Sequence, residues 1–203
     1  MRVTGGKYRG KLIESREEQN LRPTTSRIRE AVFNILKHGR FMAHEDFVPD
    51  DNPDRLEGRR VVDIFCGTGA LGIESLSYDA SHVTFIDQSA ATLTLARKNV
   101  MHIQEEKKAT FIRSDSTMLP RAAWPCDLAF VDPPYGRNLA GAALKTLADG
   151  GWLKRGAVIV LEQGKRDELV EIKGYNLLDD RLYDRTRLVI YQYVGSDNEE
   201  MVE

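Results

Sequence analysis

The stretch Val61-Val62-Asp63-Ile64-Phe65-Cys66-Gly67-Thr68-Gly69-Ala70-Leu71-Gly72 decides the fold class of this chain. It begins with an apolar run that is typical of a buried strand. A glycine-rich turn of the pattern G-x-G-x-x-G follows, and the residues after the turn favour a helix. This order places the turn at the carboxyl end of a strand, where α/β proteins bind their ligands.

Strands and helices continue to alternate after this stretch. Further strands are expected at residues 83–87, 109–113, 128–131 and 158–161. Helices are expected from about residue 70, after Ser89, and over residues 140–147. The alternation predicts an α/β fold in which helices cover both faces of a parallel sheet. Two late runs, Leu169 to Ile172 and Leu188 to Tyr193, are expected to form an antiparallel hairpin at the sheet edge.

Residues 1–40 are expected to form a small N-terminal unit. The turn dipeptide Gly5-Gly6 lies between apolar residues and predicts a short hairpin. The hydroxyl residues after Pro23 predict the start of a helix that ends near Gly39. Residues 41–60 are expected to form an acidic surface loop, residues 61–195 the core, and residues 196–203 an acidic tail.

The composition is that of a globular protein with one main domain. The chain has 203 residues, of which 41% are hydrophobic and 30% charged, enough apolar content for a core. No apolar run approaches the roughly 18 residues of a membrane helix, and no signal peptide is visible. Two cysteines and four scattered histidines argue against a disulfide framework and against a metal site. We therefore expect a cytoplasmic protein without metal.

The charge is distributed unevenly along the chain. The net charge is only −2, yet residues 1–40 hold ten basic and four acidic side chains. Clustered Lys and Arg displace counterions from phosphates, so this end of the chain is typical of a protein that binds a polyanion. A solvated charged face is the alternative interpretation.

The acidic residues around the glycine turn indicate the cofactor. Asp87 ends the second predicted strand, where a carboxylate can bind a ribose diol. Asp63 precedes the glycine turn and would repel the pyrophosphate of a dinucleotide, but it suits a cofactor with an amino-acid end and a sulfonium. We therefore expect S-adenosylmethionine. The alternative role for Asp63 is to cap a helix or brace the loop.

Asp115-Ser116 follows the third predicted strand and is expected to accept a hydrogen bond from the adenine amino group of the cofactor. It can also cap a helix. The predicted cofactor site comprises Asp63, Phe65, Gly67, Thr68, Gly69, Gly72, Asp87, Gln88, Asp115 and Ser116. Cys66 lies inside the glycine motif and is interpreted as a small packing residue rather than a nucleophile.

Asp132-Pro133-Pro134-Tyr135, after the fourth predicted strand, indicates the chemistry. The amino group of a base is a poor nucleophile because its lone pair is delocalised into the ring. The Asp132 carboxylate and the Pro133 carbonyl can accept hydrogen bonds from the two N–H groups of this amino group. These bonds direct its lone pair at a methyl group. Two prolines keep this carbonyl rigid, and Tyr135 offers a face on which an extruded base can stack. The alternative is an Asp-Pro turn with a surface tyrosine.

Together these segments resemble the RsmD-type 16S ribosomal RNA (guanine-N2)-methyltransferase family. The resemblance is carried by residues 2–10, 22–30, 63–72 and 130–135, in family order over nearly the whole chain. It implies a Rossmann-like class I S-adenosylmethionine-dependent methyltransferase with a seven-stranded, mostly parallel sheet. It further implies that the chain is a monomer and methylates a guanine of ribosomal RNA within a small-subunit particle. Residues 22–30 would border the active site.

The residues expected to bind RNA are Arg2, Lys7, Arg9, Lys11, Arg22, Thr24 and Arg27. The alternative for Arg2, Lys7, Arg9 and Lys11 is an exposed, solvated hairpin. The alternative for Arg22 and Arg27 is ion pairing with nearby acids. The D-P-P-Y box also occurs in DNA adenine-N6 methyltransferases, so the box by itself does not identify the substrate. Another RNA guanine, a DNA adenine, or a non-catalytic assembly factor that binds RNA remain the alternative functions.

Overall fold

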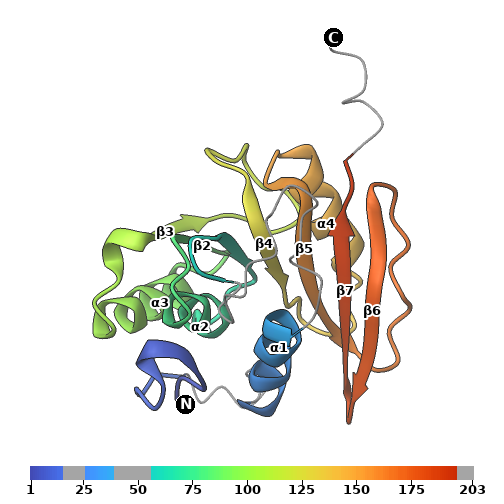
Figure 1. Cartoon of the computed structure of the whole chain (residues 1–203). Helices are drawn as coiled ribbons and strands as arrows, with labels where there is room; N and C mark the ends of the chain where they lie inside the picture. Colours follow the sequence, from blue (N-terminus) through green and yellow to red (C-terminus); the bar gives the residue numbers. More distant parts are fainter. Residues whose placement is uncertain (16–25, 39–55, 196–203) are drawn as a thin grey trace.

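A computed structural model describes residues 1–15, 26–38 and 56–195 of the chain (Figure 1). Most of the predicted acidic loop and the whole acidic tail therefore lie outside the described residues, as do Arg22 and Thr24. The helices are α1 (Ser26–His38), α2 (Ala70–Ser77), α3 (Ala90–His102) and α4 (Ala140–Asp149), with short 3-10 helices η1 (Gly6–Tyr8) and η3 (Glu106–Lys108).

A seven-stranded sheet forms the centre of the molecule, with the strand order β3-β2-β1-β4-β5-β7-β6. The strands are β1 (Arg60–Ile64), β2 (His82–Asp87), β3 (Ala109–Arg113), β4 (Cys126–Val131), β5 (Leu153–Gly164), β6 (Tyr175–Tyr183) and β7 (Thr186–Tyr193). The first five are parallel, and β7 is antiparallel to both β5 and β6. This arrangement confirms the predicted Rossmann-like α/β fold. The strand order reverses between β1 and β4, which is where such sheets bind ligands.

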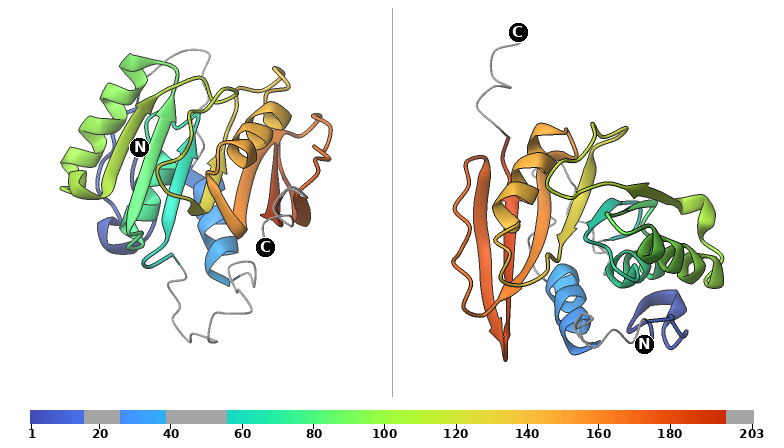
Figure 2. Two further views of the ribbon diagram at one scale, coloured as in Figure 1. Left: turned by 90° about the horizontal axis from the view of Figure 1, so that it is seen from above. Right: turned by 180° about the vertical axis from the view of Figure 1, so that it is seen from behind.

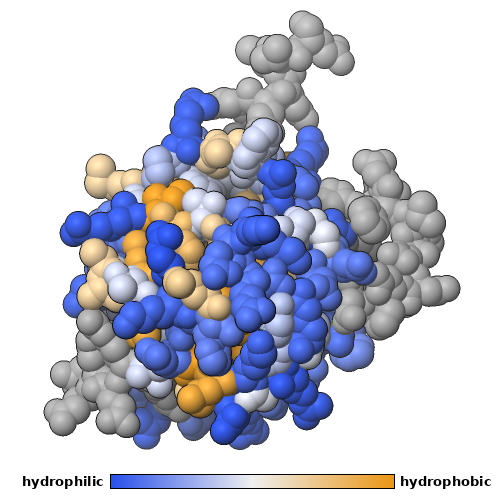
Figure 3. Space-filling view, turned by 90° about the vertical axis from the view of Figure 1, so that its left-hand side faces the viewer, coloured by the Kyte–Doolittle hydropathy of each residue, from blue (hydrophilic) through white to orange (hydrophobic). Residues whose placement is uncertain are grey.

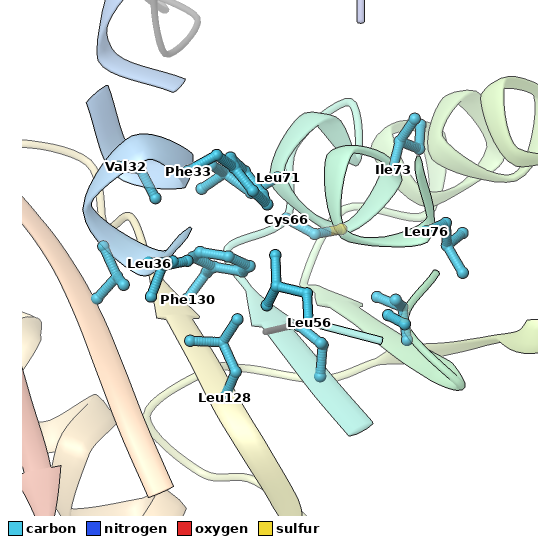
Figure 4. Close-up of a cluster of buried hydrophobic side chains, with 14 of the residues drawn as sticks. Val32, Phe33, Leu36, Leu56, Cys66, Leu71, Ile73, Leu76, Leu128 and Phe130 are labelled. Carbon is cyan, nitrogen blue, oxygen red and sulfur yellow. The ribbon is translucent and has the colours of Figure 1, made fainter. Parts of the chain in front are cut away.

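Two hydrophobic clusters cover the two faces of the sheet. Alternate residues of each strand point to opposite faces, so that Val61 belongs to one cluster and Val62 to the other. Helices α1, α2 and α3 contribute to the Val61 cluster, and α4 contributes to the Val62 cluster on the opposite face (Figure 2). Figure 4 shows Phe33 and Leu36 of α1 beside Phe130 of β4.

One arm of the predicted edge hairpin is wrong. The strand β7 confirms the run that begins at Leu188, but its partner is β6 and not the run from Leu169 to Ile172. The latter residues are apolar because they pack partly buried against the α4 side of the sheet. The carbonyl of Val170 also accepts a hydrogen bond from the Tyr191 hydroxyl at 2.7 Å. Strand β6 escaped prediction because it is a charged edge strand with little burial.

The predicted N-terminal hairpin is present in a reduced form. A single antiparallel bridge joins Arg2 and Leu12, and η1 occupies the turn between them. The dipeptide Gly5-Gly6 is not a two-residue hairpin turn. It allows the chain to approach α2, since a Cβ on Gly6 would lie 2.1 Å from the Ser77 carbonyl oxygen.

The hydropathy of the surface agrees with a sheet whose apolar faces are covered by helices. The side of the molecule that carries β3 and α3 is mostly hydrophilic, with smaller apolar areas (Figure 3). Within the described ranges, no helix combines the length and the apolar character needed to cross a bilayer.

Candidate active site at the carboxyl edge of the parallel strands

A row of carboxylates lines one face of the sheet at the carboxyl ends of its parallel strands. The paired residues Ile64, Ile86, Val131 and Leu161 all point into the cluster on the α4 side. Because side chains alternate along a strand, neighbours of these four residues face the opposite side. These neighbours are Asp63, Asp87, Asp132 and Glu162. We call these four residues the carboxylate row.

The glycine turn connects β1 with α2 and holds Asp87 in place. Gly67 and Gly69 have φ values of +54° and +79°, a backbone region that favours glycine. The amide of Gly67 donates to Asp87 Oδ2 at 3.2 Å, and the amide of Ser89 donates to Asp87 Oδ1 at 2.8 Å. Burial raises the pKa of Asp87 above its ordinary value, although both backbone bonds favour the ionised form. The Asp87 carboxylate is thus fixed beside the turn.

Asp63 adopts the helix-capping role that the sequence analysis left open, because Gly72 lies in the first turn of α2. Its side chain is buried, and its Oδ2 accepts a hydrogen bond from the amide of Gly72 at 2.9 Å. Burial raises the pKa of Asp63 well above its usual range, and the negative charges of Asp132 and Asp87 raise it further. The charges of Asp132 and Asp87 therefore disfavour the ionised form of Asp63, and a bound group with positive charge would offset the negative charge at this edge. A sulfonium cofactor fits this edge better than a pyrophosphate does.

Gly72 packs closely against the sheet, and we expect its replacement by alanine to destabilise the protein. A Cβ there would lie 2.3 Å from Phe85 Cε1 and 2.8 Å from Val83 Cγ1, both in the core. The expected loss is about 1–3 kcal/mol of unfolding free energy, measured by urea denaturation.

Gly141→Ala is the matched control for Gly72→Ala, because Gly141 also lies in a helix. A Cβ on Gly141 would meet only Val170 Cγ1, at an ordinary 3.7 Å. The higher helix propensity of alanine should leave this variant as stable as the wild type, or more stable by up to about 1 kcal/mol. Equal stabilities of the two variants would contradict the close packing at Gly72.

The segment Asp132 to Tyr135 leaves β4 at the same edge. Asp132 is half-buried and Pro133 is buried, while 43% of Tyr135 is exposed. The Tyr135 hydroxyl donates to Glu162 Oε1 at 2.6 Å and lies 3.1 Å from Thr186 Oγ1. The tyrosine is therefore attached to the sheet at its hydroxyl end, and its ring contributes exposed surface at the edge.

The other predicted cofactor residues also lie at the carboxyl ends of β1 to β3. Phe65 and Thr68 are half-buried in the glycine turn, and Gln88 is exposed directly after β2. Asp115 is exposed, and its Oδ1 accepts bonds from the amide and the hydroxyl of Thr117 at 2.8 and 2.7 Å. These bonds lower the pKa of Asp115. They give Asp115 a capping role, which does not prevent it from contacting a cofactor.

The predicted RNA-binding residues fall into distinct environments. Arg2, Arg9, Lys11 and Arg27 are exposed. Lys7 instead forms ion pairs with Asp79 and, at 2.8 Å, with Glu105. Although burial lowers the pKa of Lys7, its hydrogen bonds to these two acids raise it above the ordinary value. Lys7 thus attaches the N-terminal segment to the core through ion pairs that the sequence analysis did not expect for this residue.

The sequence analysis missed a buried ion pair that joins the N-terminal segment, α1 and α2. Arg29 of α1 lies 3.9 Å from the Glu74 carboxylate of α2, and both side chains are almost fully buried. Glu74 Oε1 also accepts bonds from the Thr4 hydroxyl and the Gly5 amide, both at 2.6 Å. The helical spacing of Arg29 to Val32 and Leu36 is the signal that would have placed it on the buried face.

A buried asparagine connects the glycine turn to the N-terminal segment. The Asn99 side-chain amide in α3 donates to the carbonyls of Thr68 at 2.9 Å and Glu14 at 3.0 Å. Its Oδ1 accepts from the Glu14 amide at 2.8 Å. A single asparagine within a helix carries no sequence signal for this role, because all its partners are distant along the chain.

Cysteine and metal chemistry find no support among the residues that the structure describes. Cys66 is buried, and this burial raises the pKa of its thiol well above the usual range, so that the nucleophilic thiolate is disfavoured. In residues 1–15, 26–38 and 56–195, no three His, Cys, Asp or Glu side chains are grouped so that they could hold a metal ion.

Comparisons with known proteins agree with this architecture. Residues 1–192 match the family described as Conserved hypothetical protein 95. The chain is 30% identical to the ribosomal RNA small subunit methyltransferase D of Escherichia coli, over 95% of this chain and 89% of that protein. It is 26% identical to the Haemophilus influenzae protein of the same name, over 95% of this chain and 93% of the relative.

A solved structure from Escherichia coli, described as a candidate methyltransferase, has a TM-score of 0.77 to this chain. The two chains are 27% identical, and the match covers 97% of this chain and 99% of the other. The similarity therefore includes the N-terminal segment and α1 as well as the sheet.

Proposed function

Since the chain belongs to the Conserved hypothetical protein 95 family, which includes the ribosomal RNA small subunit methyltransferase D, we propose that it methylates ribosomal RNA with S-adenosylmethionine. The specific target is the exocyclic N2 amino group of a guanine in the small-subunit RNA. The observation that carries the proposal is that the segment from Asp132 to Tyr135 begins within the carboxylate row, at the switch point of the sheet. The chain acts in the cytoplasm as a monomer on a small-subunit particle.

The cofactor would be held by the carboxyl ends of β1, β2 and β3. The glycine turn from Phe65 to Gly69 receives its amino-acid end, and Asp87 binds the ribose hydroxyls. Gln88, Asp115 and Ser116 lie at the end that would receive the adenine. The negative charge of Asp132 favours the sulfonium, which would supply an electrophilic methyl group when the cofactor is bound.

Asp132 and Pro133 would prepare the amino group for the reaction. The Asp132 carboxylate and the Pro133 carbonyl accept hydrogen bonds from its N–H groups. These bonds concentrate the lone pair on nitrogen and direct it at the methyl carbon. The exposed ring of Tyr135 stacks on the extruded base. With the cofactor bound, the nitrogen would take the methyl group as the carbon–sulfur bond breaks, and Asp132 or solvent would accept the surplus proton.

Transfer of a labelled methyl group tests this function directly. Small-subunit particles, total RNA and DNA are each incubated with the protein and labelled S-adenosylmethionine, and the products are digested to nucleosides. We expect N2-methylguanosine in the small-subunit RNA. If N6-methyladenosine or its deoxy form appears instead, the proposed cofactor is supported and the proposed guanine substrate is refuted. Cofactor binding without transfer to any of the three would favour the non-catalytic alternative.

We expect the exposed cations of the N-terminal segment to contact RNA phosphates. The change is Arg9→Ala together with Lys11→Ala, since both side chains are exposed. Each phosphate contact contributes about 0.7–0.9 to the slope of log affinity against log salt, so the slope should flatten by about 1.5. Binding of small-subunit RNA is measured as a function of salt concentration.

Lys7→Ala provides the contrast within the same segment. Because Lys7 is paired with Asp79 and Glu105, its removal should lower the melting temperature of the protein. The salt slope of RNA binding should stay close to the wild-type value. A slope that flattens for Lys7→Ala and not for the double variant would reverse the two assignments.

A further inference from the structure

We propose that Glu162 is a positioning residue that holds the ring of Tyr135 at the edge of the active site. The sequence analysis did not single out Glu162, because a lone glutamate near the end of an apolar strand carries no recognisable motif. The proposal rests on the proposed function in one respect, namely that Tyr135 stacks on the target base.

The geometry places Glu162 beside the residues of the D-P-P-Y motif. Val131 of β4 and Leu161 of β5 are the last pair in their parallel register, so Glu162 continues β5 abreast of Asp132. Glu162 is only 7% exposed, and its Oε1 accepts a hydrogen bond of 2.6 Å from the Tyr135 hydroxyl. Thr186, the first residue of β7, adds an oxygen 3.1 Å from the same hydroxyl. Two rigid strands therefore hold the end of one side chain.

A buried carboxylate at this position needs a reason. Val158 and Val160 precede Glu162 on the same face of β5 and belong to the hydrophobic core. Burying a carboxylate costs free energy unless hydrogen bonds compensate for the lost water. The bond from a phenol to a carboxylate is short and about twice as strong as one between neutral groups. The carboxylate thus fixes the tyrosine more firmly than a neutral acceptor would.

The ionisation of Tyr135 supports the same contact. Burial raises the pKa of Tyr135 above its ordinary value, and the negative charge and hydrogen bond of Glu162 raise it further. The charge of Asp132 acts in the same direction, whereas the bond with Thr186 opposes it. A raised pKa is expected of a phenol that donates to a carboxylate, so it agrees with the contact between Tyr135 and Glu162.

Anchoring the hydroxyl limits the positions that the ring can take. A base that stacks on a fixed ring presents its amino group to Asp132 in one orientation, whereas a mobile ring allows many unproductive ones. Misplacement of a reacting group by about 1 Å can cost up to about a hundredfold in rate. Loss of the anchor should therefore reduce kcat more than it changes cofactor binding.

A double-mutant cycle on small-subunit particles that lack the methyl group tests this role. We expect Glu162→Ala and Tyr135→Phe each to lower kcat about tenfold, and the double variant to be no slower than either. Glu162→Gln retains an acceptor oxygen and should recover most of the rate. Glu168→Gln, which removes an exposed carboxylate on the following loop, is the matched control. S-Adenosylhomocysteine affinity should match the wild type in every variant.

Two outcomes would overturn the proposal. One is a wild-type rate for Glu162→Ala, and the other is an equal further loss when Glu162→Ala is added to Tyr135→Phe. Thermal melting of each variant identifies any that fails to fold, and if Glu162→Ala does so, the ionisation of Tyr135 in Glu162→Gln decides the contact instead.

A spectroscopic titration tests the anchor without any methyl transfer. The chain has seven tyrosines, so Tyr135 is isolated as the difference between the absorbance titrations of the wild type and Tyr135→Phe. We expect Tyr135 to ionise above the ordinary tyrosine range, and Glu162→Gln to lower its pKa. An ordinary pKa in the wild type would refute the anchor. If the wild type methylates no RNA while the titration behaves as expected, the proposed function fails and the anchor stands.

Discussion

Replacement of Asp132 by alanine is expected to lower methyl transfer by about 10²–10³-fold, because it removes a preorganised acceptor for the amino group of the base. Asp132 is half-buried at the end of β4, abreast of Glu162 and close enough to Asp63 for their charges to interact. The affinity for S-adenosylhomocysteine should change little, since the glycine turn and Asp87 remain intact. Labelled methyl transfer and calorimetric titration measure the two quantities on the same preparations.

The control for Asp132→Ala is Asp149→Ala, which removes an exposed carboxylate at the end of α4. Asp149 pairs with Lys145 on the surface, and such exposed pairs contribute little to stability. Both activity and cofactor affinity should match the wild type. Unchanged turnover in Asp132→Ala would refute its role. A loss of cofactor affinity as large as the loss of turnover would show that Asp132 acts on the cofactor and not on the base.

Arg29→Met is expected to lower the free energy of unfolding by about 3–5 kcal/mol, since it leaves the Glu74 carboxylate buried without its cationic partner. The Arg29 side chain also donates to the Arg2 carbonyl at 2.9 Å, a bond that methionine cannot replace. Glu74 in turn accepts hydrogen bonds from the Thr4 and Gly5 amides. Arg29→Met should therefore loosen the N-terminal segment as well. Urea denaturation measures the loss.

Arg27→Met is the matched substitution on the same helix, where the arginine is exposed. It should leave the stability within about 0.5 kcal/mol of the wild type. The double variant Arg29→Met with Glu74→Gln removes both charges and should regain part of the loss, because no unpaired charge stays buried. If Arg29→Met proved as stable as Arg27→Met, the buried pair would contribute nothing to the fold.

The fold and the position of the site could be predicted because their signals are local. The apolar runs of β1, β2 and β4 and the glycine turn each lie within a few consecutive residues. The carboxyl ends of parallel strands meet at one edge, so the sequence predicts that Gly67, Asp87 and Asp132 lie at the same edge. The edge strand β6 lacked such a signal, since an edge strand needs no apolar face of its own.

The α/β class, the parallel core and the sheet edge that carries the D-P-P-Y motif follow from local sequence patterns. Which residues each charged or hydroxyl side chain contacts depends on the tertiary structure. Lys7 meets Asp79, Arg29 meets Glu74, and Tyr135 meets Glu162. The physical reason is that hydropathy periodicity is a property of neighbouring residues, whereas the partner of a buried charge is chosen by packing between segments that lie far apart in the chain.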